Sequence, residues 1–127
     1  MTDGRDAERE LMGYYESAGF ECYHPPKAQY REQDVFGEFD LIAFGAGRLE
    51  LVQVKAQRDA AGIRDWMKRT QQYEQVIRDC SRLFAHQKGE HWRLARPSDA
   101  GYRWIYDGRP HTEIFDQDIT QALRRVQ

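Results

Sequence analysis

The fold is decided by residues 36–56, which read FGEFDLIAFGAGRLELVQVKA. Residues 39–44 are β-formers interrupted by one acid, Asp40, and residues 49–55 alternate with the period of two that a strand requires. Between these two runs, residues 45–48 read GAGR, and glycine tolerates the positive φ that tight turns need. This stretch therefore predicts a β-hairpin.

The turn also predicts the register of the hairpin. If Phe44 lies opposite Leu49, the numbers of facing residues have a constant sum, and Asp40 faces Gln53. Directly opposed Cβ atoms lie roughly 4.5–5.5 Å apart, and a diagonal neighbour such as Lys55 lies at roughly 7–8 Å. An acid, an amide and an amine then converge at the end of an apolar hairpin. A three-residue turn without a bulge would reverse the parity and point Asp40 away from Gln53.

Charged side chains at the end of this hairpin have two interpretations. A carboxylate and an ammonium are costly in a core unless they pair or bind a metal, so one interpretation is a structural Asp40–Lys55 ion pair. The other is a functional site, because Asp40 followed by Gln53-Val54-Lys55 resembles the PD-(D/E)xK nuclease motif. Two positions depart from that motif: Phe39 stands where Pro is common, and Gln53 stands where Glu or Asp is usual. Some relatives have QxK.

The rest of the chain predicts a mixed sheet with helices on its faces. A helix capped by Thr2 or Asp3 ends at Gly19, and a strand over residues 20–24 ends at two prolines. A long polar loop over residues 25–38 leads into Asp40. We further expect a long helix over residues 63–87, which could break near residues 79–81, strands over 91–96 and 102–106, and a last helix capped by Asp116. The expected order of elements is α, β, β, β, α, β, β, α.

Two glutamates of the first helix differ in their position on the helical wheel. Glu8 lies one turn before Leu11 and Met12, on the side that faces the core, whereas Glu10 lies on the flank with Asp6. Only Glu8 is therefore placed to point at a buried site. The alternative is that Glu8 merely favours the N-terminus of the helix.

Length and composition limit the class of protein. A chain of 127 residues with 40% hydrophobic residues is expected to form a single domain, over residues 1–127, with a core of its own. No run of about 18 apolar residues occurs, and the charged N-terminus lacks the apolar region of a signal peptide. Two cysteines and four histidines lack metal-ligand spacing, which favours a reducing, cytoplasmic location and argues against a zinc site.

Charge is distributed unevenly along the chain. Residues 1–50 hold five Lys or Arg against eleven Asp or Glu, residues 51–88 hold eight against four, and the remaining residues hold six against six. Acidic metal ligands with a separate basic strip would give this distribution, as would an ordinary solvated helix. The residues expected to bind DNA are Lys27, Arg31, Arg58, Arg64, Lys68, Arg69 and Gln72, the six cations through phosphates.

Three further segments resemble the archaeal-type Holliday junction resolvases within the PD-(D/E)xK superfamily. The sequence AEREL at residues 7–11, with Gly19-Phe20, resembles the family's opening ERxL…GF motif, and the family's metal-binding glutamate falls on Glu8. Residues 72–77 resemble the helix after the motif, and residues 94–96 with 101–104 resemble the closing strand pair. The resemblance covers roughly residues 5–107 and implies a restriction-endonuclease-like α/β fold with an αβββαβ core.

The resemblance implies a Mg²⁺-dependent endonuclease that cuts four-way DNA junctions, works as a homodimer and accepts Mn²⁺ in place of Mg²⁺. Glu8, Asp40, the Gln53 side chain and the Val54 carbonyl would hold the metal, and Lys55 would orient water and stabilise charge on the phosphate. The aromatic residues Tyr102, Trp104 and Tyr106 are the candidate dimer contact, with core packing as the alternative. Two other functions stay open: a restriction or Mrr-type enzyme cutting duplex DNA, and a non-catalytic DNA-binding protein.

Overall fold

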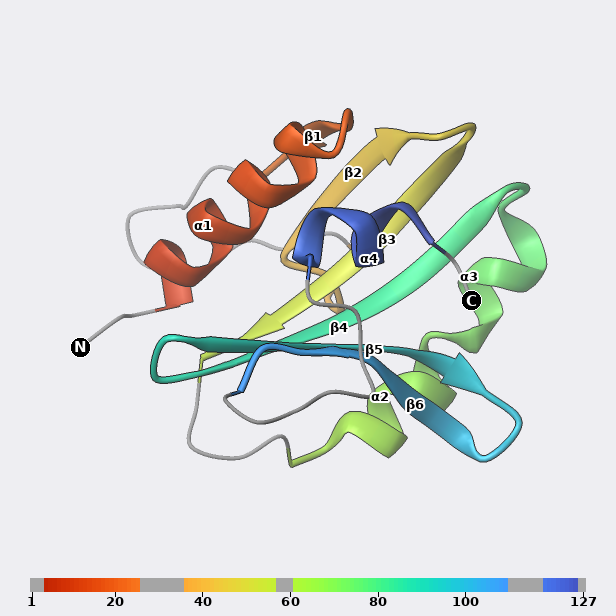
Figure 1. Cartoon of the computed structure of the whole chain (residues 1–127). Helices are drawn as coiled ribbons and strands as arrows, with labels where there is room; N and C mark the ends of the chain where they lie inside the picture. Colours follow the sequence, from red (N-terminus) through yellow and green to blue (C-terminus); the bar gives the residue numbers. More distant parts are fainter. Residues whose placement is uncertain (1–3, 26–35, 57–60, 110–117, 126–127) are drawn as a thin grey trace.

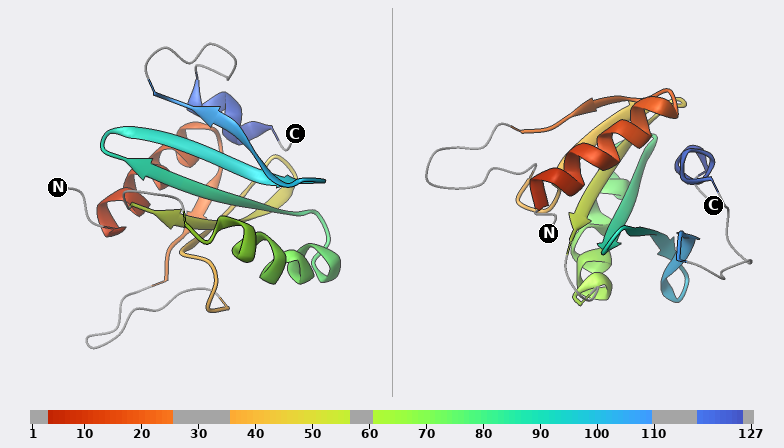
Figure 2. Two further views of the ribbon diagram at one scale, coloured as in Figure 1. Left: turned by 90° about the horizontal axis from the view of Figure 1, so that it is seen from below. Right: turned by 60° about the vertical axis from the view of Figure 1, so that its left-hand side comes forward.

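The computed structural model describes residues 4–25, 36–56, 61–109 and 118–125. Its strands form one six-stranded sheet in the order β1-β2-β3-β4-β5-β6, with helices on both faces (Figures 1 and 2). In chain order the elements are α1 (Gly4–Ser17), β1 (Glu21–Tyr23), β2 (Leu41–Gly45), β3 (Arg48–Lys55), α2 (Ile63–Arg69), α3 (Gln71–Val76), β4 (Cys80–Lys88), β5 (His91–Ser98), β6 (Gly101–Asp107) and α4 (Ile119–Arg124).

The β2–β3 hairpin has the predicted register. Phe44 pairs with Leu49, and the two-residue loop between Gly45 and Arg48 consists of Ala46 and Gly47. Both loop residues have positive φ, 52° and 75°, the combination whose twist matches that of the flanking strands. The turn chemistry of the GAGR segment therefore sets which side chains of β3 share a face.

The two faces of the sheet carry two separate apolar clusters. On one face, α1 and α4 pack against side chains that include Val52 and Val54 of β3. On the other face, α2 packs against Leu51 and its neighbours, together with Phe84 of β4. Figure 2 shows α1 and the α2–α3 pair on opposite sides of the strands. Alternate residues of β3 thus enter different clusters, as its period of two predicts.

The prediction of one long helix over residues 63–87 is wrong. Helical structure ends at Val76, and β4 begins at Cys80, parallel to β3. Residues 81–87 are all buried, because β4 is central in the sheet and is covered on both faces. Continuous burial removes the polar alternation by which a half-exposed strand is recognised, so this segment resembles a buried helix in sequence. Asp79, with φ of 52°, reverses the chain before β4.

The predicted ends of the first and last helices agree in part with those of α1 and α4. Gly19, with φ of 95°, follows α1 as the expected stop, while the proposed caps Thr2 and Asp3 lie outside the described residues. The described cap of α4 is Asp118, whose carboxylate accepts a hydrogen bond from the Thr120 N–H at 3.0 Å. Asp116 also lies outside the described residues. No helix in the described segments is both long and apolar enough to cross a membrane.

The prediction that three aromatic residues of β6 share one face is also wrong. A register shift at Leu94/Ala95 places Tyr106 opposite Leu94, while Trp104 lies opposite Ala95. Tyr102 and Trp104 contact each other edge-to-face, with ring centroids 5.7 Å apart, and pack on the cluster beneath α2. Tyr106 packs on the cluster beneath α1 instead. The extra residue of the bulge reverses the parity, so these side chains do not form one dimer surface.

A buried ionic cluster joins β3, β5 and α4. Glu50 is fully buried, and Arg96 donates to both of its carboxylate oxygens, at 2.7 and 3.1 Å. Arg48 donates to the same carboxylate at 3.0 Å and to the carbonyl of Leu123 at 2.8 Å, which attaches the end of α4 to the sheet. Burial, followed by the Glu50 charge, raises the pKa of Tyr15, whose hydroxyl donates to Glu50 at 3.0 Å. We refer to these residues as the Glu50 cluster.

Candidate active site

Asp40 lies where the paired part of β2 begins. Its N–H donates to the Val52 carbonyl at 2.8 Å, although the hairpin register pairs Val52 with Leu41. Its carboxylate oxygen Oδ2 accepts the N–H of Val54 at 2.8 Å. The expected direct pairing of Asp40 with Gln53 is therefore replaced by an irregular end of the hairpin, in which the Asp40 side chain binds the backbone of β3.

Gln53 and Lys55 lie on the face of β3 that is covered by α2. Both line a cavity of about 390 Å³, and Asp40 lines it as well. The Lys55 ammonium donates to the carbonyl of Ala61 at 2.7 Å. The structure therefore brings the acid, the amide and the amine to one cavity.

The opposite wall of this cavity comes from α2 and from the segment before Asp40. Arg69 binds both carboxylate oxygens of Glu38, at 3.1 and 3.2 Å, and Trp66 donates its ring N–H to the Glu38 carbonyl at 2.9 Å. The Glu38 hydrogen bond raises the pKa of Arg69. Asp65 also lines the cavity. Sequence reasoning missed Asp65, although its spacing of four from Arg69 places both on one flank of α2.

Glu8 is buried, as the helical wheel predicts, but its partner is not in this cavity. Its carboxylate pairs with the ring of His24, just after β1, and Glu8 is not among the described residues that line the cavity. Glu10 is exposed and accepts hydrogen bonds from Tyr14 at 3.4 Å and from Gln87 at 2.8 Å. The role of Glu8 as a metal ligand stays a prediction.

The residues proposed to contact DNA fall into three groups. Lys27, Arg31 and Arg58 lie outside the described residues. Arg69 and Gln72 lie near the candidate active site, where Gln72 donates to the Arg69 carbonyl at 3.2 Å. The third group, Arg64 and Lys68, lines a different cavity.

The oxygen donors of the cavity fit a hard divalent cation with few protein ligands. Mg²⁺ is usually held by one or two carboxylates and completes its shell with waters and substrate phosphates. Asp40 and Gln53 line the cavity together, and a carboxylate and an amide side chain both carry oxygen donors of this kind. Among residues 4–25, 36–56, 61–109 and 118–125, no three His, Cys, Asp or Glu side chains are grouped to hold a metal. This donor set is unlike the four-ligand sites of structural zinc.

The two cysteines do not add soft ligands to the site. Both are unpaired thiols, and burial raises the pKa of Cys22 and of Cys80 to about 11. Neither cysteine is among the described residues that line the cavity.

No family model matches the sequence, and no curated protein matches it. Among solved structures, the fold is similar to that of Hjc from Archaeoglobus fulgidus, a Holliday junction resolvase from an archaeal hyperthermophile. The TM-score is 0.50 with 17% sequence identity, and the match covers 73% of this chain and 76% of that one. An identity this low identifies the architecture alone. The chain has a restriction-endonuclease-like α/β fold, a mixed sheet flanked by helices.

Proposed function

We propose that this protein is a metal-dependent endonuclease that cleaves phosphodiester bonds of four-way DNA junctions. The observation that carries the proposal is the meeting of Asp40, Gln53 and Lys55 in one cavity of this fold. Similarity to a junction resolvase supports the choice of branched DNA as the substrate.

Asp40 and Gln53 would hold Mg²⁺, with the Val54 carbonyl as a further oxygen donor. The chemistry that bound Mg²⁺ supplies is a more acidic water and compensation of charge on the phosphate. The hydrogen bond from the Val54 N–H holds the Asp40 carboxylate in a fixed orientation, so little reorganisation is needed on binding. Because Gln53 is neutral, the site has less negative charge than the usual motif gives and should bind the metal more weakly.

Lys55 would act on the phosphate and on the attacking water. Its ammonium has three N–H donors, and the Ala61 carbonyl occupies one of them at 2.7 Å. This contact restrains the long side chain at the rim of the cavity. The remaining donors are suited to bind a phosphate oxygen that gains negative charge in the transition state.

The proposal is tested by incubating the protein with a four-way junction and with a linear duplex of matched sequence, in Mg²⁺ and in EDTA. We expect the junction to be cleaved and the duplex to stay intact, and we expect cleavage in Mg²⁺ but not in EDTA. Equal cleavage of both substrates would favour a restriction or Mrr-type nuclease on the same fold.

Two observations favour a non-catalytic alternative. Gln53 takes the place of an acid, and the described residues contain no cluster of three potential metal ligands. A DNA-binding protein that has lost cleavage would have this appearance. Calorimetric titration with Mg²⁺ separates the two functions. A nuclease should bind the ion, whereas a non-catalytic DNA-binding protein should bind DNA without binding the ion and without cleavage.

A further inference from the structure

A second cavity of about 390 Å³ lies between α2 and the turn that joins β5 to β6. Its polar lining consists mainly of Arg64, Lys68, Arg82, Ser98 and Asp99. It shares no lining residue with the candidate active site, although α2 contributes to both cavities. Asp65 and Arg69 face the candidate active site, while Arg64 and Lys68, one turn apart, face the second cavity.

Arg64 is held in a fixed position at the wall of this cavity. Its Nη1 donates to the carbonyl of Ala100 at 2.9 Å, and its guanidinium carbon lies 5.2 Å from the centre of the Tyr102 ring. Its Nε and Nη2 groups donate to no other residue within the described segments. A guanidinium that is already oriented loses little conformational freedom when it binds an anion.

The floor of the cavity contains a buried cation. Arg82 is 3% exposed, its guanidinium pairs with Glu74, and it donates to the Met67 carbonyl and the Thr70 hydroxyl. These bonds fix Arg82 and join β4 to the helices above it. Lys68 is exposed at the rim and forms no ion pair with a described residue. Three cations therefore surround a space whose lining contains one carboxylate, that of Asp99.

We propose that this second cavity is a phosphate-binding subsite for a nucleic-acid backbone, separate from the cavity that holds Asp40. The proposal rests on the proposed function for the identity of the macromolecule, and it adds where a second stretch of the DNA backbone is held. Arg64 and Lys68 contact phosphate, while Arg82, whose charge is compensated by Glu74, forms the rigid floor of the cavity. Backbone phosphates are recognised by such cations without base readout, which suits a substrate selected by shape.

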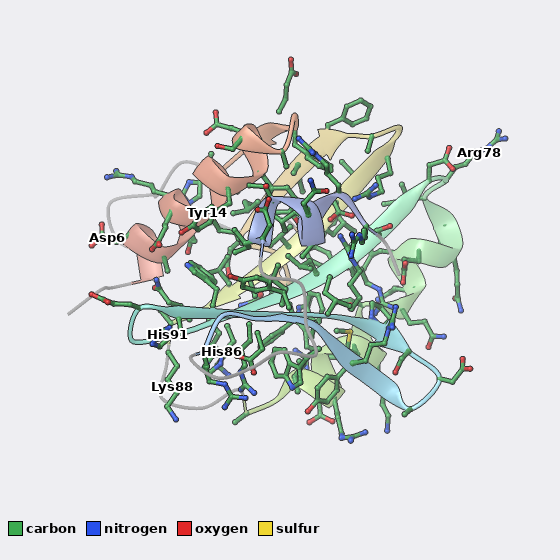
Figure 3. All side chains as sticks on the ribbon, in the orientation of Figure 1. Asp6, Tyr14, Arg78, His86, Lys88 and His91 are labelled. Carbon is green, nitrogen blue, oxygen red and sulfur yellow. The ribbon has the colours of Figure 1, made fainter. Side chains whose placement is uncertain are left out.

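The test measures equilibrium binding to a four-way junction in EDTA, between 50 and 200 mM salt, for the parent protein and for Arg64→Ala, Lys68→Gln and the double variant. Each lost phosphate contact is expected to reduce the slope of log affinity against log salt by about 0.9. The matched control is Arg78→Ala, which removes the same charge from an exposed side chain that points away from the molecule, in the connection between α3 and β4 (Figure 3).

The double variant should reduce the slope by about two, and Arg78→Ala should leave it unchanged. A slope for the double variant equal to that of Arg78→Ala would overturn the subsite. A second variant blocks the cavity without changing charge: Ala100→Trp, at an exposed turn position, should weaken junction binding several-fold. Melting temperatures within a few degrees of the parent value would show that each variant is folded.

Two further measurements complete the test. The first distinguishes backbone phosphate from a small phosphate ligand, and the second separates failure of the subsite from failure of the proposed nuclease function. Inorganic phosphate and a mononucleotide are titrated against bound junction; displacement at micromolar concentrations would identify a small-molecule site and overturn the backbone subsite. Cleavage is measured in Mg²⁺ at saturating junction. If the parent does not cut but the slopes differ as expected, the nuclease proposal fails and the subsite stands. If it cuts and the slopes are equal, the subsite alone fails.

Discussion

At the scale of single residues, the side chain of Asp40 makes a hydrogen bond that a backbone carbonyl of a neighbouring strand usually makes. Its carboxylate accepts the N–H of Val54, in the part of β3 that also supplies Gln53 and Lys55. The same carboxylate lines the candidate active site. Replacing it therefore tests both a structural contact and a chemical role, and the choice of substitution can separate them.

Asp40→Asn keeps a side-chain oxygen that can accept the Val54 N–H but removes the negative charge. We expect loss of detectable junction cleavage, with DNA affinity unchanged or higher, because a charge that repels phosphate has been removed. Single-turnover cleavage in saturating Mg²⁺, beside binding in EDTA, measures both effects. A variant that cuts at the parental rate would exclude Asp40 from the chemistry.

Gln53→Glu adds the acid that the usual PD-(D/E)xK motif has at this position. A second carboxylate in the cavity should tighten Mg²⁺ binding, so that half-maximal cleavage needs roughly tenfold less metal; the extra charge–metal attraction is on the order of 1–2 kcal/mol at a partly solvated site. Calorimetry with Mg²⁺ in the absence of DNA checks this without relying on activity. Unchanged metal affinity would mean that the residue 53 side chain does not reach the ion.

Glu8 and Glu10 are a matched pair of acids in α1. We expect Glu8→Gln to abolish cleavage and Glu10→Gln to leave it nearly normal, as the resemblance to the resolvases and the helical wheel both favour Glu8. Because Gln can still hydrogen-bond to His24, thermal melting should stay close to that of the parent. If Glu8→Gln keeps its activity, its carboxylate serves only to hold His24.

At the scale of secondary-structure elements, the Glu50 cluster attaches α4 to the sheet. Arg48 and Arg96 each donate to Glu50 and to carbonyls at the end of α4, so a single carboxylate orients both guanidinium groups. Removing one partner of such a pair leaves buried charges without compensation. The cluster lies on the face of α1 and α4, away from the cavity that contains Lys55.

Glu50→Ala should lower the free energy of unfolding by about 3–5 kcal/mol, the usual cost of breaking a buried ion pair from one side. Chemical denaturation followed by circular dichroism measures this loss. Glu21→Ala, at an exposed position of β1, is the control and should change stability by less than about 0.5 kcal/mol. A Glu50 variant as stable as the control would show that the two arginines are satisfied without this carboxylate.

At the scale of the whole molecule, one chain presents one candidate catalytic cavity in its described part, whereas a four-way junction has two equivalent cleavage points. A two-fold symmetric dimer would meet both points at once. We therefore expect a dimer in sedimentation of the junction complex and paired cuts at symmetric positions. A strict monomer, both free and bound to the junction, would leave a nicking nuclease on this fold. The three aromatic residues of β6 do not form one continuous contact surface, because the bulge divides those side chains between two clusters.

Local chemistry in the sequence was sufficient to predict the β2–β3 hairpin and to assign each side chain of β3 to one face of the sheet. A two-residue loop with Gly47 has few allowed conformations, and a strand's period of two then assigns each side chain to a face. These local rules place Gln53 and Lys55 on one face of β3, whereas the irregular end of the hairpin, at which the Asp40 carboxylate accepts the Val54 N–H, brings Asp40 to the same cavity. The burial of Glu8 and the exposure of Glu10 could likewise be predicted from helical periodicity alone.

Tertiary structure alone decided the features that depend on distant partners. β4 is a strand because β3 on one side and β5 on the other satisfy its backbone, and its continuous burial leaves no periodic signal. Glu8 contacts His24, and Asp65 shares a cavity with Gln53. In both cases the separation of the two residues in sequence says nothing of their distance in space. The same holds for the second cavity, where α2 meets the β5–β6 turn: each element has an ordinary sequence, and only their packing brings three cations around one space.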